Sequence, residues 1–302
     1  MKKKFNKVNI EISNICNLQC SFCPEVIRSK KMMQIDFFES LIRQLVFLTE
    51  QVCFHLMGDP LVHPQLAEMV QICERHKMPV FFVSNGVLLK ESTNEILLNP
   101  IIRQVNFSLH SFFDNYPTKN PDNYLKKIFA FTEQAFMQRP DLYINYRLWN
   151  LNDPRGSQTN NTLMLKKIEN HFHVTIPKTI DVRHKKSLRL KNLLYLHYDT
   201  EFIWPSLEQN ILGTEGTCYG LSSHFGILAD GTVVPCCLDK EGQIPLGNAQ
   251  QNSLIEILSS PKAQEILLGF KKRKLVNPLC QRCNYIERFA STIYTQPAPS
   301  YA

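Results

Sequence analysis

The sequence predicts an α/β fold, in the form of a wide or incomplete barrel of parallel strands. Strand-like and helix-like segments alternate through the first half of the 302 residues. Such alternation is typical of parallel strands joined by right-handed crossover helices. Several strands also carry polar residues on one face, whereas a tightly filled parallel barrel is apolar on both faces. We therefore expect a lumen that is wide enough to hold a polar ligand.

The expected strands are short and end in loop or turn residues. They cover 8–12, 52–57, 79–83, 105–109 and 142–148. The helices between them are amphipathic, and the first, over 36–49, begins with a capping-box pair of Asp36 and Glu39. Polar residues alternate with apolar ones along the fourth and fifth strands, so Ser108 and Arg147 are expected on the lumen face.

Composition and charge exclude several classes of protein. Hydrophobic residues make up 44% and charged residues 20%, which is ordinary for a globular chain and unlike a disordered or fibrous one. The net charge of +7 is a weak indication of an anionic partner. We find neither a membrane-spanning apolar stretch nor a signal peptide, so we expect a cytoplasmic protein. In that compartment ten cysteines are more typical of metal ligands than of disulfides.

The first group of cysteines follows the first strand directly. Cys16, Cys20 and Cys23 have the spacing C-x3-C-x2-C. Three thiolates on one short loop bind three irons of a 4Fe-4S cluster and leave the fourth iron without a protein ligand. Zinc is the alternative, but structural zinc sites use four ligands, usually in C-x2-C pairs. The spacing therefore favours iron-sulfur, with an open coordination position.

This motif, placed after strand one of a β/α barrel, resembles the radical S-adenosylmethionine (radical SAM) superfamily. The resemblance implies a partial (β/α)6 TIM-like barrel with a small C-terminal iron-sulfur module. It implies that Cys16, Cys20 and Cys23 hold the cluster and that SAM chelates the open iron through its amino and carboxylate groups. It also implies that Phe22 packs near the SAM adenine, the alternative being a hydrophobic plug over the cluster.

Other segments fall where the resemblance expects them. Met57-Gly58-Asp59-Pro60 takes the place of a Gly-Gly-Glu-Pro sequence that contacts the SAM amino group, although Met57 and Asp59 depart from it. The triplet 84–86 takes the place of Thr-Asn-Gly. Arg147 is a candidate to pair with the SAM carboxylate, and a structural role is the alternative for it. The full set of implied SAM or substrate contacts is Phe22, Gly58, Asp59, Pro60, Ser84, Asn85, Ser108, His110, Asn145 and Arg147.

A second group of cysteines lies near the end of the chain, at Cys218, Cys236, Cys280 and Cys283. Asp230-Gly231 indicates a hairpin turn inside this region. The arrangement resembles the SPASM extension that follows many radical SAM barrels. A full SPASM module has seven cysteines for two auxiliary clusters, but no cysteine follows Cys283 here. The resemblance therefore implies one auxiliary 4Fe-4S cluster, with Cys237 in reserve as a ligand and zinc as the alternative metal.

These assignments divide the chain into four parts. We predict a radical SAM core barrel over 1–190, a linker over 191–212, a separate SPASM-like module over 213–290 and a tail over 291–302. Because the barrel begins within ten residues of Met1, we expect no peptide-leader recognition domain before it.

The resemblance implies reductive cleavage of SAM, with an electron donor such as flavodoxin or ferredoxin as partner. The resulting 5′-deoxyadenosyl radical abstracts hydrogen from a substrate, which we expect to be a peptide or protein side chain. Basic stretches at 178–191 and 271–274 allow an RNA substrate instead. The same pattern is compatible with an enzyme that acts on a small metabolite and with a non-catalytic iron-sulfur or zinc protein.

Overall fold

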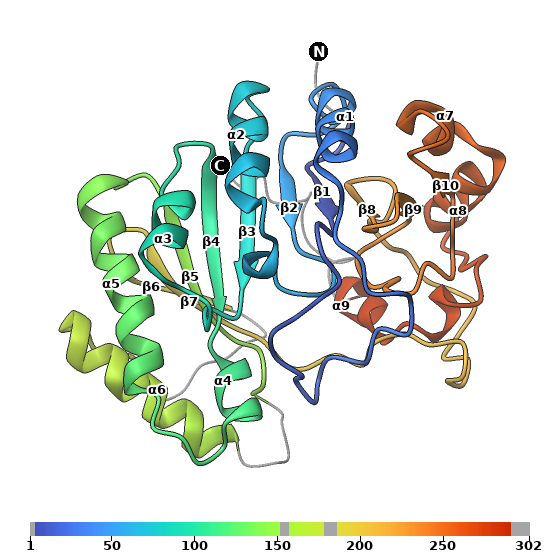
Figure 1. Ribbon diagram of the computed structural model, residues 1–302. Coiled ribbons are helices and arrows are strands. Elements are labelled where there is room, and N and C mark those ends of the chain that lie inside the picture. Colours follow the sequence, from blue (N-terminus) through green and yellow to red (C-terminus); the bar gives the residue numbers. More distant parts are fainter. Residues whose placement is uncertain (1–3, 152–156, 178–185, 291–302) are drawn as a thin grey trace.

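A ten-stranded sheet forms the centre of the protein. The computed structural model describes residues 4–151, 157–177 and 186–290. The strands follow the order β10-β9-β8-β1-β2-β3-β4-β5-β7-β6 (Figure 1). Six neighbouring strands run parallel, namely β1 (Lys7–Ile10), β2 (Val52–Phe54), β3 (Val80–Ser84), β4 (Ile102–Ser108), β5 (Tyr143–Leu148) and β7 (Leu194–Tyr198). Within the described ranges the two ends of the sheet do not pair with each other, so the predicted α/β class is confirmed as an open, parallel-rich sheet.

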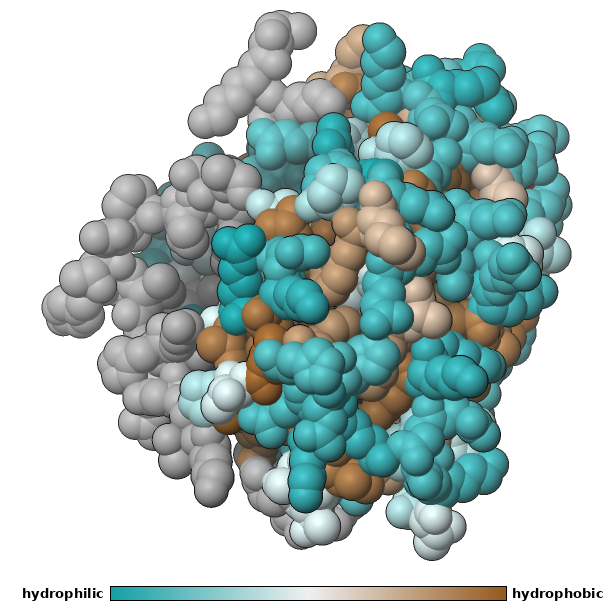
Figure 2. Space-filling model, turned by 90° about the vertical axis from the view of Figure 1, so that its left-hand side faces the viewer, coloured by the Kyte–Doolittle hydropathy of each residue, from teal (hydrophilic) through white to brown (hydrophobic). Residues whose placement is uncertain are grey.

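Helices cover the outer face of the parallel strands. They are α1 (Ile35–Leu45), α2 (Leu66–Arg75), α3 (Glu91–Leu97), α5 (Asp122–Gln138) and α6 (Ser157–Phe172), whereas the short α4 (His110–Asn115) lies beyond the end of β4. Aromatic contacts join the two layers: Phe38 of α1 lies 5.6 Å from Phe54 of β2, and Phe131 of α5 lies 5.6 Å from Phe107 of β4, between ring centroids. The opposite faces of these helices are solvated, and the side of the molecule seen in Figure 2 is mostly hydrophilic.

The inner face of the sheet is polar, as predicted. Val105 and Phe107 of β4 are fully buried against the helices, whereas Asn106 points the other way and donates a hydrogen bond to the Phe82 carbonyl (3.0 Å). Asn145 of β5 in turn donates to the Asn106 side-chain oxygen (3.0 Å). These bonds satisfy the polar groups and keep the face hydrophilic without filling it with apolar side chains.

The C-terminal module is joined to the barrel through the sheet. Strand β8 (His224–Ile227) pairs in parallel with β1, so it extends the same sheet. Strand β9 (Thr232–Val234) returns antiparallel after the predicted turn, where Gly231 has a φ of +91°, and β10 (Gly247–Asn248) follows. The pairing requires a free edge on β1, and the incomplete barrel leaves that edge open.

The segment that we predict as a linker, 191–212, contains strand β7, and β6 (Ser187–Lys191) pairs antiparallel with it at the far edge. The strand is hard to recognise from sequence because only Leu194, Leu196 and Tyr198 are buried, and polar residues alternate with them. The remaining elements belong to the C-terminal half: α7 (Leu254–Ser259), α8 (Pro261–Lys271), η2 (Cys280–Arg282), η3 (Asn284–Ile286) and α9 (Glu287–Ala290). In the described part of the chain, no helix is both long and apolar enough to cross a membrane.

The junction of β8 with β1 is expected to carry much of the stability of the C-terminal half. Phe225 is fully buried, with its ring centroid 4.9 Å from that of Phe5. Phe225→Ala should lower the free energy of unfolding by about 3–5 kcal/mol, because it removes a large core side chain. Phe47→Ala is the control, since Phe47 is 78% exposed and its loss should change stability by less than about 0.5 kcal/mol. Denaturant unfolding of both variants measures this, and equal effects would contradict it.

Candidate cofactor-binding site

The three N-terminal cysteines lie on the loop between β1 and α1, residues 11–34, which we call the cluster loop. Cys20 is buried, whereas Cys16 and Cys23 are exposed. Amide groups point at two of the sulfur atoms: Asn115 Nδ2 donates to Cys20 Sγ (3.1 Å), and Asn85 Nδ2 lies 3.8 Å from Cys16 Sγ. The Leu18 backbone N–H also donates to Cys16 Sγ (3.4 Å). Donors of this kind stabilise thiolates and tune iron-sulfur clusters.

The loop after β2 is fitted against the cluster loop through a glycine. Gly58 has a φ of +72°, and a Cβ built there would lie 2.4 Å from the Ser13 carbonyl oxygen and 2.7 Å from that of Ile15. The Asp59 N–H donates to the same Ile15 oxygen (3.0 Å). Only glycine combines this backbone conformation with so close an approach. Gly58 therefore allows the loop after β2 to pack directly against the backbone of the cluster loop.

Asp59 holds three loops together. Its buried carboxylate accepts hydrogen bonds from the Leu61 N–H (2.9 Å), the Ser84 hydroxyl (2.9 Å) and the Asn85 N–H (2.8 Å). Burial raises the pKa of Asp59, while these hydrogen bonds oppose the rise. The side chains of Asp59 and Ser84, predicted as SAM contacts, are thus engaged with each other. Pro60 follows in a short 3-10 turn, η1 (Pro60–Val62).

Helix α4 clamps the other side of the cluster loop, which the sequence did not reveal. The Asp114 carboxylate accepts hydrogen bonds from both the backbone N–H and the hydroxyl of Ser21. The side-chain oxygen of Asn115 accepts a hydrogen bond from the Gln19 N–H (2.9 Å), and its side-chain nitrogen donates to Cys20 Sγ. Asp114 and Asn115 follow shortly after the predicted strand over 105–109 and after His110. No local signal shows that this short helix folds back onto a loop some 95 residues earlier.

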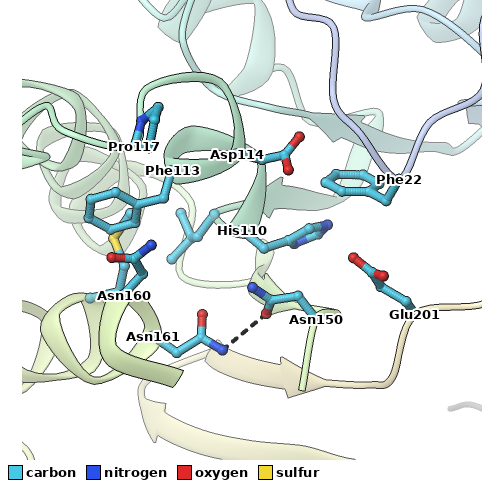
Figure 3. Close-up of a pocket in the computed structure, with 11 residues that line it drawn as sticks. Phe22, His110, Phe113, Asp114, Pro117, Asn150, Asn160, Asn161 and Glu201 are labelled. Carbon is cyan, nitrogen blue, oxygen red and sulfur yellow. Dashed lines mark hydrogen bonds between the residues drawn. The ribbon is translucent and has the colours of Figure 1, made fainter. Parts of the chain in front are cut away.

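A cavity of about 220 Å³ opens beside the cluster loop (Figure 3). Phe22 and His110 are in contact with each other on its wall, with ring centroids 4.8 Å apart. Burial lowers the pKa of His110 to about 4, so its imidazole is neutral at physiological pH. The opposite wall carries Asn150, which accepts a hydrogen bond from Asn161 of α6 (3.0 Å). Glu201, Asn150 and Asn161 were not predicted, because no local pattern shows that the ends of β5 and β7 and the start of α6 meet beside the cluster loop.

The predicted site residues therefore fall into two groups. Phe22, Gly58, Asp59, Pro60, Ser84, Asn85 and His110 lie on or beside the cluster loop. Ser108, Asn145 and Arg147 lie on the inner faces of β4 and β5, where Ser108 pairs with Arg147 in register. They do not line the cavity.

The C-terminal cysteines also gather at one place. Burial raises the pKa of Cys218 to about 11, and the nearby Cys283 and Cys237 thiols contribute to the rise. Burial also raises the pKa of Cys280, with contributions from Cys218 and Cys283. Burial raises the pKa of Cys236, and the neighbouring thiols of Cys237, Cys218 and Cys280 contribute to the rise. Each of the four predicted ligands thus lies near at least two of the others, and Cys237 lies beside them.

Ion pairs join this module to the cluster loop. Arg28 follows the last cysteine of the loop. Its guanidinium forms a bidentate ion pair with buried Glu11 (3.1 and 2.9 Å) and donates a hydrogen bond to the Lys240 carbonyl (2.7 Å). Glu241 accepts from the backbone N–H groups of Ile27 and Arg28 (3.2 Å each). Because Lys240 and Glu241 follow Cys236 closely, the two cysteine groups share a common framework.

The chemistry of both cysteine groups suits iron-sulfur clusters. The donors offered are thiols, and N–H groups point at the sulfur atoms of Cys16, Cys20 and Cys218. The residues present therefore fit iron-sulfur clusters.

Comparison with known families agrees with this chemistry. Residues 10–146 match the radical SAM superfamily, and residues 218–284 match SPASM, an iron-sulfur cluster-binding domain. The chain carries a radical SAM domain and a C-terminal SPASM domain. A radical SAM domain binds a 4Fe-4S cluster and SAM, and a SPASM domain binds auxiliary iron-sulfur clusters, so the predicted family and cofactors are confirmed. Which residues of this radical SAM protein hold them stays a prediction.

Individual relatives are distant. A GTP 3′,8-cyclase of Chlorobaculum tepidum is 26% identical over 201 residues, which cover 65% of this chain and 56% of that protein. The crystal structure of BtrN in complex with AdoMet and 2-DOIA is 17% identical with a TM-score of 0.57, covering 94% of both chains. Streptococcus suis SuiB bound to precursor peptide SuiA is 16% identical with a TM-score of 0.63, covering 95% of this chain and 73% of the other. These structures share the fold.

Gly58 provides a test of how the cluster loop is held. With two 4Fe-4S clusters, the anaerobically reconstituted protein should contain about eight irons. Gly58→Ala should lower this toward four, because the added Cβ meets backbone oxygens of the cluster loop. Replacing Cys16, Cys20 and Cys23 by Ala should do the same. Gly213→Ala is the control, since a Cβ there meets nothing within 4 Å. Full iron content in Gly58→Ala would contradict this account.

Proposed function

We propose that this protein cleaves SAM reductively at the cluster held by Cys16, Cys20 and Cys23, and that it uses the radical to abstract hydrogen from a peptide or protein side chain. The bound cluster and SAM supply the electron transfer and the 5′-deoxyadenosyl radical. An electron donor such as flavodoxin or ferredoxin is the partner that this chemistry requires. The protein itself must orient the cofactor and keep water away from it.

The observation that carries this proposal is the position of the cysteine loop. The cluster loop is supported by the loops after β2 and β3 on one side and by α4 on the other, and their amide groups reach the thiols of Cys16 and Cys20. The cavity lined by Phe22 and His110 adjoins the same loop. Adenine stacks favourably on aromatic side chains such as Phe22, so we assign the SAM adenine to this cavity. Asp59 and Ser84 act as positioning residues for the loop.

The peptide substrate is supported by the proteins that share the fold. SuiB is bound to a precursor peptide in its crystal structure, and anSMEcpe is bound to AdoMet and the Cp18Cys peptide. The latter is 16% identical with a TM-score of 0.57, covering 91% of this chain and 87% of the other. We also propose that the SPASM domain uses Cys218, Cys236, Cys280 and Cys283 as ligands of one auxiliary 4Fe-4S cluster.

An RNA substrate is the second candidate. Lys271, Lys272, Arg273 and Lys274 are all exposed, and none of them has an ion-pair partner among the described residues. Four free cations in a row suit phosphate binding. The other predicted basic stretch, 178–191, lies outside the described residues as far as position 185. In its described part, Lys186 is paired with Asp199 (3.0 Å).

SAM cleavage is the direct test of the proposed function. The loaded protein with a strong reductant should form 5′-deoxyadenosine slowly even without substrate. Cys20→Ala should abolish this, because the cluster that delivers the electron is lost, whereas Cys73→Ala keeps all proposed ligands and should retain it. Chromatography of the products measures both. If the loaded wild-type protein forms none, the proposal is wrong, and a binding protein becomes the better account.

Salt dependence separates an RNA substrate from a peptide. If the run 271–274 binds RNA, affinity for total small RNA should fall steeply, by about tenfold or more, between low and physiological salt, because bound phosphates release counterions. Replacing all four residues by Ala should flatten that dependence. Filter binding at several salt concentrations measures it. Weak binding that does not depend on salt would leave the peptide substrate as the better candidate.

A further inference from the structure

Asn115, the last residue of α4, places an amide group unusually close to one cysteine sulfur of the cluster loop. Its Nδ2 donates to Cys20 Sγ at 3.1 Å. The two N–H groups near Cys16 Sγ are farther from that sulfur, at 3.4 and 3.8 Å. Cys20 is also buried, so water competes little for its sulfur. A hydrogen bond that is shielded from water has a stronger electrostatic effect than an exposed one.

The orientation of the Asn115 amide is fixed by its other partners. Its Oδ1 accepts from the Gln19 backbone N–H (2.9 Å), and its Nδ2 also donates to the Ser111 carbonyl (2.9 Å). A backbone N–H can only donate and a carbonyl can only accept, so the nitrogen and the oxygen of the amide cannot exchange places. The sulfur of Cys20 therefore faces an N–H donor.

Helix α4 holds this donor in place from the outside. The Phe112 ring stacks on that of Tyr124 of α5, with centroids 4.6 Å apart. The Tyr124 hydroxyl in turn donates to the Asn85 carbonyl in the loop after β3 (2.7 Å). The amide is thus positioned by packed elements before any charge changes beside it, and such a preorganised donor has little reorganisation to undergo when charge develops.

We propose that Asn115 raises the reduction potential of the cluster held at Cys20, which makes that cluster easier for a protein electron donor to reduce. This inference rests on the proposed function and concerns how the first electron enters. The donor protein loses one electron, the cluster with its thiolates gains it, and no bond is made or broken. An N–H group aimed at a ligand sulfur stabilises the added negative charge. Asn115 is a positioning residue, since it acts through Cys20.

A redox titration of the loaded full-length protein, followed by electron paramagnetic resonance, tests this proposal. The relevant signal is the one that is missing in Cys20→Ala. Asn115→Leu has a similar shape but no donor, and it should lower the equilibrium constant for reduction about tenfold, which is about 59 mV for a one-electron couple. An unchanged or higher potential in Asn115→Leu would overturn the proposal.

Asp114→Asn is the matched control for a loop that is merely loosened. Asp114 belongs to the same clamp, through Ser21, but its carboxylate donates no hydrogen bond to a sulfur. The substitution removes a negative charge beside the cluster loop and leaves Asn115 in place, so the potential should rise or stay the same. Equal falls in Asp114→Asn and Asn115→Leu would show that the clamp acts only through structure, and the proposal would be wrong.

A second variant covers the case in which Asn115→Leu loses the cluster. Asn115→Asp keeps an oxygen to accept from Gln19 but removes the donor to Cys20, so its potential should fall at least as far. Loss of the cluster in both variants, seen as about four irons instead of about eight, would show that Asn115 only holds the loop and would overturn the proposal. Failure of the proposed function is visible separately, as a wild-type protein that forms no 5′-deoxyadenosine although its potential responds to these substitutions.

Discussion

The close approach of Gly58 to the backbone of the cluster loop is the constraint on which the site depends. No larger residue fits at 2.4 Å from the Ser13 oxygen, so the loop after β2 and the loop that carries the cysteines must keep their relative positions. Asp59, next in sequence, extends this constraint to the loop after β3 through its buried carboxylate. The cysteines thus lie on a segment without regular secondary structure whose position is fixed by these contacts.

The same loop is also held from the C-terminal half of the chain. Glu11, Arg28 and Glu241 form a continuous network between the cluster loop and the segment that follows Cys236. Strand β8, which extends the sheet at β1, brings these groups together. The open edge of the incomplete barrel therefore has a structural use, because it allows the second module to dock on the strand that leads into the first cysteine group.

Local patterns in the sequence predicted a large part of this arrangement. Cys16, Cys20 and Cys23 are recognisable because their spacing lies within eight residues, and the polar lumen follows from alternation along single strands. The clamp by Asn115 and the pairing of Arg28 with Glu241 depend on contacts between residues about 95 and 213 positions apart, which no local pattern reports. Strand β7 was missed because its polar inner face hides the strand among loop-like residues.

Electron paramagnetic resonance of the dithionite-reduced protein tests the central claim most directly, namely that SAM binds the cluster on the Cys16–Cys23 loop. Adding SAM should change the signal of one reduced cluster and leave the auxiliary signal as it was, because in the proposed ligand assignment only the first cluster has an iron without a protein ligand. The SAM-sensitive signal should be missing in Cys20→Ala. A wild-type spectrum that SAM does not alter would contradict the account.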